Sequence, residues 1–280
     1  AQTCYADARV ALVQHFRCVP ACIAYSNSLF YHNKLQPRRL PPRSRRLEPA
    51  LIDVRVPNAT RRGKINEAEA NALVRYLVDE LAREDSEIKD ASVGVISLGG
   101  VEQARLLRVK MLESLSDVQL ARHRVVVGDP TSFQGDERDV ILLSMVASAK
   151  STYPQLGRMY EQRFNVALSR ARDRMVLFRS LNASDVPNPD DLKLKTIQFF
   201  ASSAHARTLA RANAASPHAD ASVDASAASS PVGQLHNYLA SRGYLFTGDC
   251  PVAGSAAVVE DAACDRRLCI CLDGGSSLSE

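Results

Sequence analysis

The chain has 280 residues, of which 46% are hydrophobic and 24% charged, and these values are ordinary for a globular protein. Its net charge of +4 is weakly basic, so charge alone neither establishes nor excludes a nucleic-acid partner. No stretch approaches the roughly 20 apolar residues that a membrane-spanning helix needs, which argues against a membrane protein.

The chain starts at Ala1 without a signal-peptide pattern, so we expect a start inside a longer reading frame or at a processed or designed boundary. An odd count of 7 cysteines predicts reduced thiols in an intracellular protein, in the cytoplasm or the nucleus. The pairs Cys18/Cys22 and Cys269/Cys271 lack partners at zinc-site spacing, so we expect small core residues and no metal site.

Strand and helix patterns alternate through residues 1–200. The run Ser92–Leu98 is typical of a buried parallel strand, whereas Asn66–Arg83 has apolar residues at helical spacing. This alternation predicts an α/β layered fold with a mainly parallel sheet. We expect strands at 51–56, 92–98, 125–127, 140–146 and 175–178, and helices at 66–83, 101–115 and 160–172.

The composition changes after residue 200. Residues 201–231 are mostly Ala and Ser, which predicts a flexible linker. Residues 232–280 are few for an independent core, so we expect a small α/β tail that belongs to a larger domain or docks on the main one. A short helix over 235–241 and strands over 256–259 and 267–272 are expected there.

An early segment combines prolines with five arginines, Arg38, Arg39, Arg43, Arg45 and Arg46. Two interpretations stay open. The segment is either a solvated loop stiffened by proline or a loop that contacts phosphates.

An arginine beside an aromatic residue precedes a proline in His15–Pro20. Arg17 in such a turn can reach a phosphate, and Phe16 can place its ring against a base. In isolation, these residues are also compatible with a helix-entry turn that carries a surface arginine.

The polar segment Asp129–Asp139 contains a glycine and lies between two expected strands. Polar side chains between strands reach a sheet edge, where α/β folds bind ligands. Gln134 and Glu137 there can orient a water, a ribose hydroxyl or a neighbouring arginine. The alternative is a charged hairpin loop.

The segment Arg163–Arg172 has the sequence RFNVALSRAR. Its apolar residues can form the buried face of a helix, but its arginines do not all lie on one face of that helix. Arg170 and Arg172 are either exposed to solvent or supply positive charge to a transferring phosphoryl group.

Together and in this order, HFRCVP, SFQGDERD and NVALSRAR resemble motifs IV, V and VI of superfamily 1 helicases. The branch is the one that includes the nonsense-mediated-decay RNA helicase and related DNA helicases. Its patterns are approximately Q-Y-R-x-x-P, S-x-Q-G-x-E-x-D and N-V-A-L-[ST]-R-A-R. His15 and Phe16 depart from the first pattern, whereas Arg17 and Pro20 keep it.

The strand Gly94–Ser97, with Gln103 downstream, is similar to that family's intermediate strand-and-loop motif. The resemblance covers roughly residues 9–200. It implies a RecA-like three-layer domain, the second (C-terminal) motor domain of an ATP-dependent DNA or RNA helicase or translocase.

The resemblance also implies a role for each matching position. Arg17 and Arg170 would contact the γ-phosphate and stabilise its developing charge. Gln134 and Arg172 would couple hydrolysis to movement. The residues expected at the nucleotide are Phe16, Arg17, Gly135, Glu137, Arg170 and Arg172, and those expected at a single DNA or RNA strand are Ser97, Thr131 and Ser132.

No G-x-x-x-x-G-K-[ST] phosphate-binding loop occurs in the chain, because Gly63-Lys64 is followed by Ile65 and lacks the earlier glycine. No apolar strand ends in paired acids for Mg²⁺. We therefore expect an upstream RecA-like domain to complete the ATP site and to hold the magnesium.

The tail resembles the start of a restriction-endonuclease-like domain in its Arg242-Gly243-Tyr244 turn and its final Asp273-Gly274. The family's acids would fall at Ala256 and Cys271, so the resemblance implies an inactive relic. A small unrelated α/β cap remains the alternative.

Two further functions stay open for the whole chain. One is a nucleic-acid-binding or regulatory remnant that has lost the motor, and the other is a nuclease subunit, against which the tail's missing acids argue. Direction of movement rests on family analogy alone.

Overall fold

The structure is a computed structural model that describes residues 12–149, 153–202, 245–247, 257–261 and 266–270. A five-stranded parallel sheet forms its centre. The strand order is β3-β7-β6-β4-β5, and every neighbouring pair in this sheet is parallel. The predicted α/β fold is therefore confirmed. The strands are β3 (Leu51–Arg55), β4 (Val93–Ser97), β5 (Val126–Gly128), β6 (Arg138–Ser144) and β7 (Ala171–Arg179).

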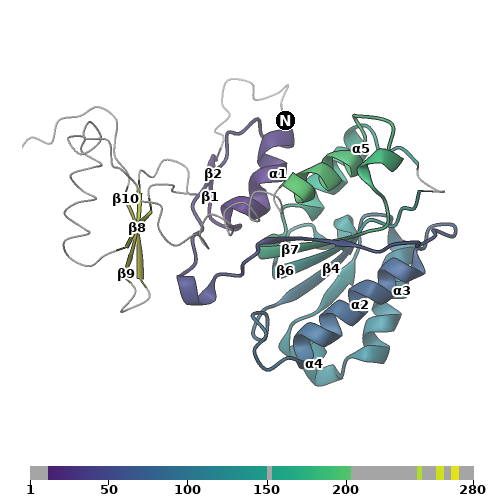
Figure 1. Cartoon of the computed structure of the whole chain (residues 1–280), viewed down its shortest axis with the longest axis horizontal. Coiled ribbons are helices and arrows are strands. Elements are labelled where there is room, and N and C mark those ends of the chain that lie inside the picture. The colour runs from purple at the N-terminus through teal and green to yellow at the C-terminus, as the bar shows by residue number, and fades with distance from the viewer. Residues whose placement is uncertain (1–11, 150–152, 203–244, 248–256, 262–265, 271–280) are drawn as a thin grey trace, which may run out of the picture.

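Helices cover both faces of this sheet, which makes three layers (Figure 1). One face carries α2 (Glu67–Ala82), α3 (Val101–Ser114) and the short α4 (Asp117–Arg122). The other face carries α1 (Pro20–Phe30) and α5 (Arg158–Ala167).

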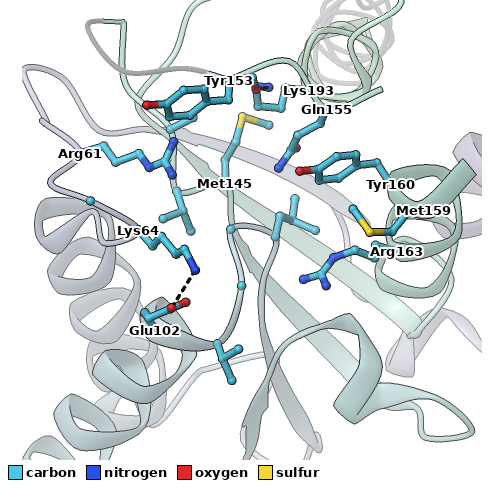
Figure 2. A pocket seen from close by; sticks show the side chains of 17 residues that line it. Arg61, Lys64, Glu102, Met145, Tyr153, Gln155, Met159, Tyr160, Arg163 and Lys193 are labelled. Carbon is cyan, nitrogen blue, oxygen red and sulfur yellow. Dashed lines mark hydrogen bonds and ion pairs between the residues drawn. The ribbon is translucent and has the colours of Figure 1, made fainter. Parts of the chain in front are cut away.

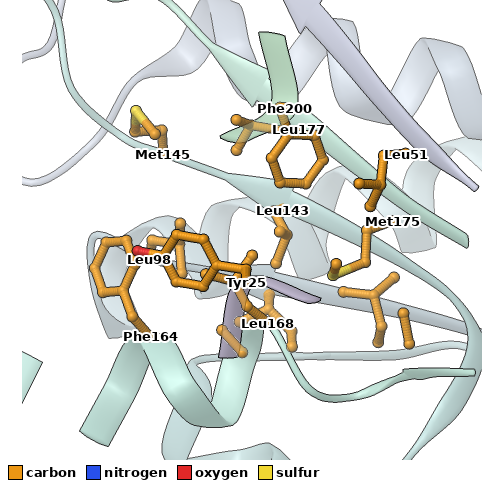
Figure 3. Packing of buried hydrophobic residues seen from close by; sticks show 14 of the residues in the cluster. Tyr25, Leu51, Leu98, Leu143, Met145, Phe164, Leu168, Met175, Leu177 and Phe200 are labelled. Atoms are coloured by element: carbon orange, nitrogen blue, oxygen red, sulfur yellow. The ribbon is translucent and has the colours of Figure 1, made fainter. Parts of the chain in front are cut away.

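Each face has its own apolar core. The α2/α3 face buries residues such as Leu77, Leu107 and Val140. The α1/α5 face buries Tyr25 and Phe164 against strand residues of β6 and β7 (Figure 3). The strands contribute apolar side chains to both faces, as is usual for a parallel sheet enclosed by helices.

Local signals explain several helix starts. The Asn66 side chain accepts a hydrogen bond from the Glu69 N–H and so caps α2. A reciprocal capping box between Ser116 and Gln119 starts α4. Pro20 occupies the first turn of α1, where its missing N–H costs nothing.

The remaining elements are short. A two-stranded parallel ladder joins β1 (Gln14–His15) to β2 (Gln36–Pro37). Residues 192–202 are helical and follow β7. Single 3₁₀ turns occur at η2 (Arg43–Arg45), η3 (Pro130–Phe133) and η4 (Ala183–Asp185).

The segment between β5 and β6 is not a hairpin, so that alternative is wrong. β5 and β6 lie on opposite sides of β4 and run parallel to it, and the chain must therefore cross over β4. Phe133 is fully buried at this crossing. A Cβ atom at Gly94 would lie 2.7 Å from the Phe133 ring, so the glycine leaves the space that the ring occupies.

Replacing Gly94 with alanine should therefore destabilise the fold. The added Cβ would meet Phe133 at 2.7 Å and Ile141 at 2.5 Å, both fully buried. Overpacking of this kind costs about 2 kcal/mol, which urea unfolding would measure. Val118→Ala, at a position 76% exposed, is the control and should change stability by less than about 0.5 kcal/mol. Equal stability of Gly94→Ala and the parent would contradict the crossing argument.

Most expected elements are present, with ends shifted by at most two residues. There are two exceptions. The strand expected at 175–178 begins four residues earlier, at Ala171, and the helix expected at 160–172 therefore ends at Ala167. Arg172 therefore lies on a strand. Cys18 and Cys22 are fully buried, as expected for core residues.

In the tail, β8 (Leu245–Thr247), β9 (Ala257–Asp261) and β10 (Arg266–Ile270) form an antiparallel sheet in the order β10-β9-β8. The last two match the strands expected there. The linker was expected at 201–231, but residues 201–202 continue the helix that begins at residue 192. The rest of the expected linker, the expected helix at 235–241 and Asp273 lie outside the described residues. Within the described part of the chain, no helix is both long and apolar enough to cross a membrane.

Candidate functional site

Motifs V and VI meet where β6 and β7 begin. Arg138, the first residue of β6, pairs with Ala171, the first residue of β7. The Arg138 backbone N–H also donates to the Arg170 carbonyl at 3.1 Å. Glu137 and Arg170 each directly precede one of these paired residues, so the sheet register places the two motifs side by side.

Motif IV joins the same edge of the sheet. The Val19 N–H donates to the Arg172 carbonyl at 2.8 Å, and the Arg17 guanidinium donates to the Ser169 carbonyl at 3.4 Å. Arg17 also forms an ion pair with Glu137, whose carboxylate lies 2.7 Å from its Nε atom. Three segments far apart in the sequence thus converge on one carboxylate.

Arg172 lies between two carboxylates. Its guanidinium is 3.8 Å from Glu137 and 3.6 Å from Asp139. Asp139 is itself fixed, because it accepts hydrogen bonds from the Ser92 N–H at 2.9 Å and the Ser92 hydroxyl at 2.7 Å. Burial opposes ionisation of Asp139, but these hydrogen bonds and Arg172 lower its pKa overall.

Arg170 differs from its neighbours because no carboxylate lies within ion-pair distance of it in the described part of the chain. Its guanidinium donates only to the backbone carbonyls of Val166 at 3.1 Å and Asp136 at 3.3 Å. Burial and the positive charge of Arg17 both lower its pKa. A half-buried arginine beside a second arginine, without an acid of its own, favours an anionic ligand at this position.

His15 and Phe16, which depart from the motif IV pattern, have distinct environments. The His15 Nε2 atom accepts the Cys18 N–H at 3.2 Å and so stabilises the turn before α1. Burial and Arg17 lower the pKa of His15, which keeps the ring neutral as this hydrogen bond requires. The Phe16 ring is 66% exposed and open to a planar ligand.

Gln134 and Gly135 are exposed and lie at the end of the crossing loop. Gly135 has a φ of +86°, and a Cβ there would meet no atom within 4 Å. Glycine is therefore required by backbone conformation and not by crowding.

The arginine-rich loop lies beside the same cluster. Arg39 forms a bidentate ion pair with Asp173 on β7, at 2.9 and 2.8 Å, so this arginine has a structural role. The loop borders a cleft of about 910 Å³ that Arg172 and Asp139 also line. Sequence patterns did not indicate the pairing of Arg39 with Asp173.

Thr131 and Ser132, two of the residues expected to contact a nucleic-acid strand, follow the end of β5. Asp129 accepts hydrogen bonds from the hydroxyls of Thr131 and Ser132 and pairs with Arg163 at 3.4 Å. Burial opposes ionisation of Asp129, but the two hydroxyls lower its pKa overall. Thr131 and Ser132 are exposed, whereas Ser97 is fully buried within β4. The Ser97 hydroxyl therefore has no access to a strand in this structure.

A buried polar network, which sequence patterns indicated only through Gln103, connects the strand ends. The Gln103 amide exchanges two hydrogen bonds of 2.9 Å with the Asn66 backbone. Glu69 accepts from the hydroxyls of Ser144 at 2.9 Å and Ser180 at 2.8 Å. The network therefore ties α2 and α3 to the ends of β6 and β7.

The cluster of Arg17, Glu137, Arg170 and Arg172 fits the phosphates of a nucleotide only in part. Arg17, Arg170 and Arg172 offer cationic donors, but no phosphate-binding loop accompanies them. Among the described residues, no group of three or more His, Cys, Asp or Glu is arranged to hold a metal ion.

Helices cover both faces of one parallel sheet, and motifs IV, V and VI gather at the starts of β6 and β7. This arrangement defines the class as a RecA-like domain of the superfamily 1 helicase type. A family model described as "AAA domain" matches residues 1–181. The chain belongs to this family.

Two curated helicases are similar to parts of the chain. The DNA replication ATP-dependent helicase/nuclease dna2 of Schizosaccharomyces pombe is 30% identical over 138 residues, covering 48% of this chain and 9% of that protein. The 5'-3' DNA helicase ZGRF1 of Mus musculus is 30% identical over 183 residues, covering 62% of this chain and 9% of that protein. The matched part is thus a small fraction of each relative.

Among solved structures, the chain is similar to the C-terminal domain of a possible DNA helicase from Lactobacillus plantarum WCFS1. The identity is 15% and the TM-score 0.36, over 59% of this chain and 87% of that one.

Proposed function

We propose that the chain is the second motor domain of an ATP-dependent superfamily 1 DNA or RNA helicase or translocase, and that an upstream RecA-like domain completes its ATP site. The observation that carries the proposal is the position of Arg170, half-buried beside Arg17 and without a carboxylate partner. Both named relatives are DNA helicases, which supports the motor role.

In this proposal, Arg17 and Arg170 donate to the γ-phosphate and stabilise charge that spreads over its oxygens during transfer. Glu137 holds the Arg17 guanidinium in place through its 2.7 Å ion pair. Phe16 offers its exposed ring to the base, and Gly135 permits the turn that brings Glu137 to the ribose or phosphates. Mg²⁺ would neutralise phosphate charge, with its ligands on the upstream domain.

Movement would be coupled to hydrolysis through Gln134 and Arg172. The ion pairs of Arg172 with Glu137 and Asp139 support this role, because both acids belong to the segment that continues from the crossing loop. The same loop begins with Thr131 and Ser132, the proposed contacts to the strand. A displacement of the loop near Glu137 would therefore be transmitted over a few residues to Thr131 and Ser132.

The experiment compares ATP hydrolysis by the 280-residue chain and by the protein that includes the upstream domain. The isolated chain should show only background hydrolysis, whereas the longer protein should hydrolyse ATP faster when single-stranded DNA or RNA is added. Arg170-dependent turnover by the isolated chain would contradict the half-site proposal. A longer protein without a phosphate-binding loop or turnover would instead support a non-enzymatic remnant.

A further inference from the structure

A cavity of about 660 Å³ opens beside the residues that follow the ends of β4 and β6. Figure 2 shows the side chains that line it. The cluster of Arg17, Arg170 and Arg172 lies at the other end of the sheet, where β6 and β7 begin. It is formed by the loop after β3, the start of α3, the end of β6 and the segment around α5. Its lining includes the loop after β4, which belongs to the intermediate motif, and Arg163 of the motif VI segment. Arg61, Tyr153 and Lys193 lie outside the motifs. Its polar and aromatic side chains include Arg61, Lys64, Tyr153, Gln155, Arg163 and Lys193.

The lining is rich in positive charge. Four cationic side chains and one carboxylate, Glu102, line the cavity, and Lys64 pairs with Glu102 at 3.0 Å. Arg61 has no carboxylate within ion-pair distance in the described residues, and its buried Nε atom has no hydrogen-bond partner. Gln155 likewise has a buried amide oxygen without a partner. Unpartnered polar atoms in a basic cavity favour a polar, anionic ligand.

The cavity also has an aromatic wall. Tyr153 is 71% exposed as a residue, and the Arg61 guanidinium lies over its ring at 5.3 Å from the ring centre. Lys193, which is buried, donates to the Tyr153 carbonyl and pairs with Asp191 at 2.8 Å. This anchor fixes the backbone of Tyr153 beside the cavity. Cations combined with a held aromatic ring are the chemistry that binds single-stranded nucleic acid.

Gly99 and Gly100 line the floor of the cavity. A Cβ at Gly99 would lie 2.4 Å from the Cβ atom of Val146, so this glycine makes room for Val146. Val146 has a φ of +58°, and its N–H donates to Glu69 at 2.7 Å. The buried network therefore holds this floor in its shape.

Arg163 connects the cavity to the proposed strand contacts. It lines the cavity and pairs with Asp129, which accepts the hydroxyls of Thr131 and Ser132. We propose that this cavity, the Arg61–Tyr153 pocket, binds one phosphate and the adjoining base of the single strand that passes Thr131 and Ser132. The inference rests on the proposed function and extends it to residues outside the motifs.

The test measures binding of a fluorescent oligothymidylate of about 15 nucleotides to the 280-residue chain at low salt, by anisotropy. Arg61→Gln and Tyr153→Leu should each weaken binding by about tenfold, because stacking and phosphate contacts of this kind have effects of that size. Arg122→Gln is the matched control on α4, where Arg122 pairs only with the exposed Asp90. It should change affinity by less than about twofold, since it lies outside the pocket. Circular dichroism verifies the fold of each variant.

Thr131→Ala separates this inference from the proposed function. Weaker binding by Thr131→Ala with unchanged binding by Arg61→Gln and Tyr153→Leu would overturn the pocket and leave the proposed strand contacts intact. No binding by the parent chain at any attainable concentration would overturn both. Competition with inorganic phosphate or thymidine monophosphate tests whether the pocket binds a free phosphate in place of a strand. If either displaces the oligonucleotide at a similar concentration, the pocket takes a free phosphate and the strand assignment fails.

Discussion

Replacing Arg170 with glutamine should lower kcat for ATP hydrolysis at least about 1,000-fold in the protein that carries both motor domains. Unlike Arg17 and Arg172, Arg170 has no carboxylate partner among the described residues, and Arg17 lies near enough to help lower its pKa. Under the proposed function, its charge is therefore available for the γ-phosphoryl oxygens. Glutamine keeps a hydrogen-bond donor but removes that charge, so the loss should fall mainly on kcat.

Two controls make this result specific. Arg122→Gln removes a distant exposed arginine and should leave kcat within about twofold of the parent, because only a charge at the nucleotide stabilises the transition state. Arg170→Lys restores the charge without the planar guanidinium and should recover only part of the rate. A glutamine variant that hydrolyses ATP at the parent rate would remove Arg170 from the site. An equal loss for both glutamine variants would indicate a general defect.

Replacing Glu69 with alanine should lower the free energy of unfolding by about 3 kcal/mol, the largest stability effect that we expect. Glu69 is fully buried and accepts hydrogen bonds from Val146, Ser144 and Ser180. Alanine would leave these donors buried without their acceptor and would open a cavity. Urea unfolding near pH 6 is the measurement. Glu67→Ala, exposed on the same helix, should cost less than about 0.5 kcal/mol.

Glu69 should also make stability depend on pH. Burial raises its pKa to about 7, although its hydrogen bonds oppose the shift. Its folded pKa is above the usual 4.5, so the folded state holds the proton more tightly than the unfolded state. Its favourable contribution is complete below about pH 4.5 and is lost as the pH rises through about 7.

Glu69→Gln cannot titrate at this position. Relative to this variant, the parent should therefore lose about 3 kcal/mol of stability between about pH 4.5 and pH 8. Urea unfolding across that range measures the difference. Glu67→Gln serves as the matched control and should follow the parent curve. A constant difference between the parent and Glu69→Gln would show that Glu69 does not titrate near neutrality.

The sequence predicted the layered fold well because strand runs and helical spacing are local patterns. It failed over residues 168–172, which the expected helix at 160–172 included. The helix ends at Ala167 because the β7 backbone from Ala171 pairs with β6, and this pairing is not encoded in local spacing. The hairpin alternative failed for a similar reason, since only the order of β6, β4 and β5 shows that the loop crosses the sheet.

The candidate site was predictable where residues are contiguous in motifs. Register then explains why Glu137 and Arg170 become neighbours. Long-range pairs left no comparable signal, and Arg39 with Asp173 is an example, because its partners are separated by 134 positions. Ser97 is a residue for which a motif match predicted a contact that the fold does not allow. Its match to a motif suggested contact with a strand, but its place in the central strand β4 buries it completely.

The central claim is that this chain supplies the arginine half of an ATP site, and binding of a transition-state analogue tests it most directly. The measurement compares the affinities of the two-domain protein for magnesium ADP with and without aluminium fluoride. The parent should bind the fluoride complex at least about 100-fold more tightly than ADP alone. Arg170→Gln should lose most of this gain while binding ADP as the parent does. A variant that keeps the full gain would contradict the account.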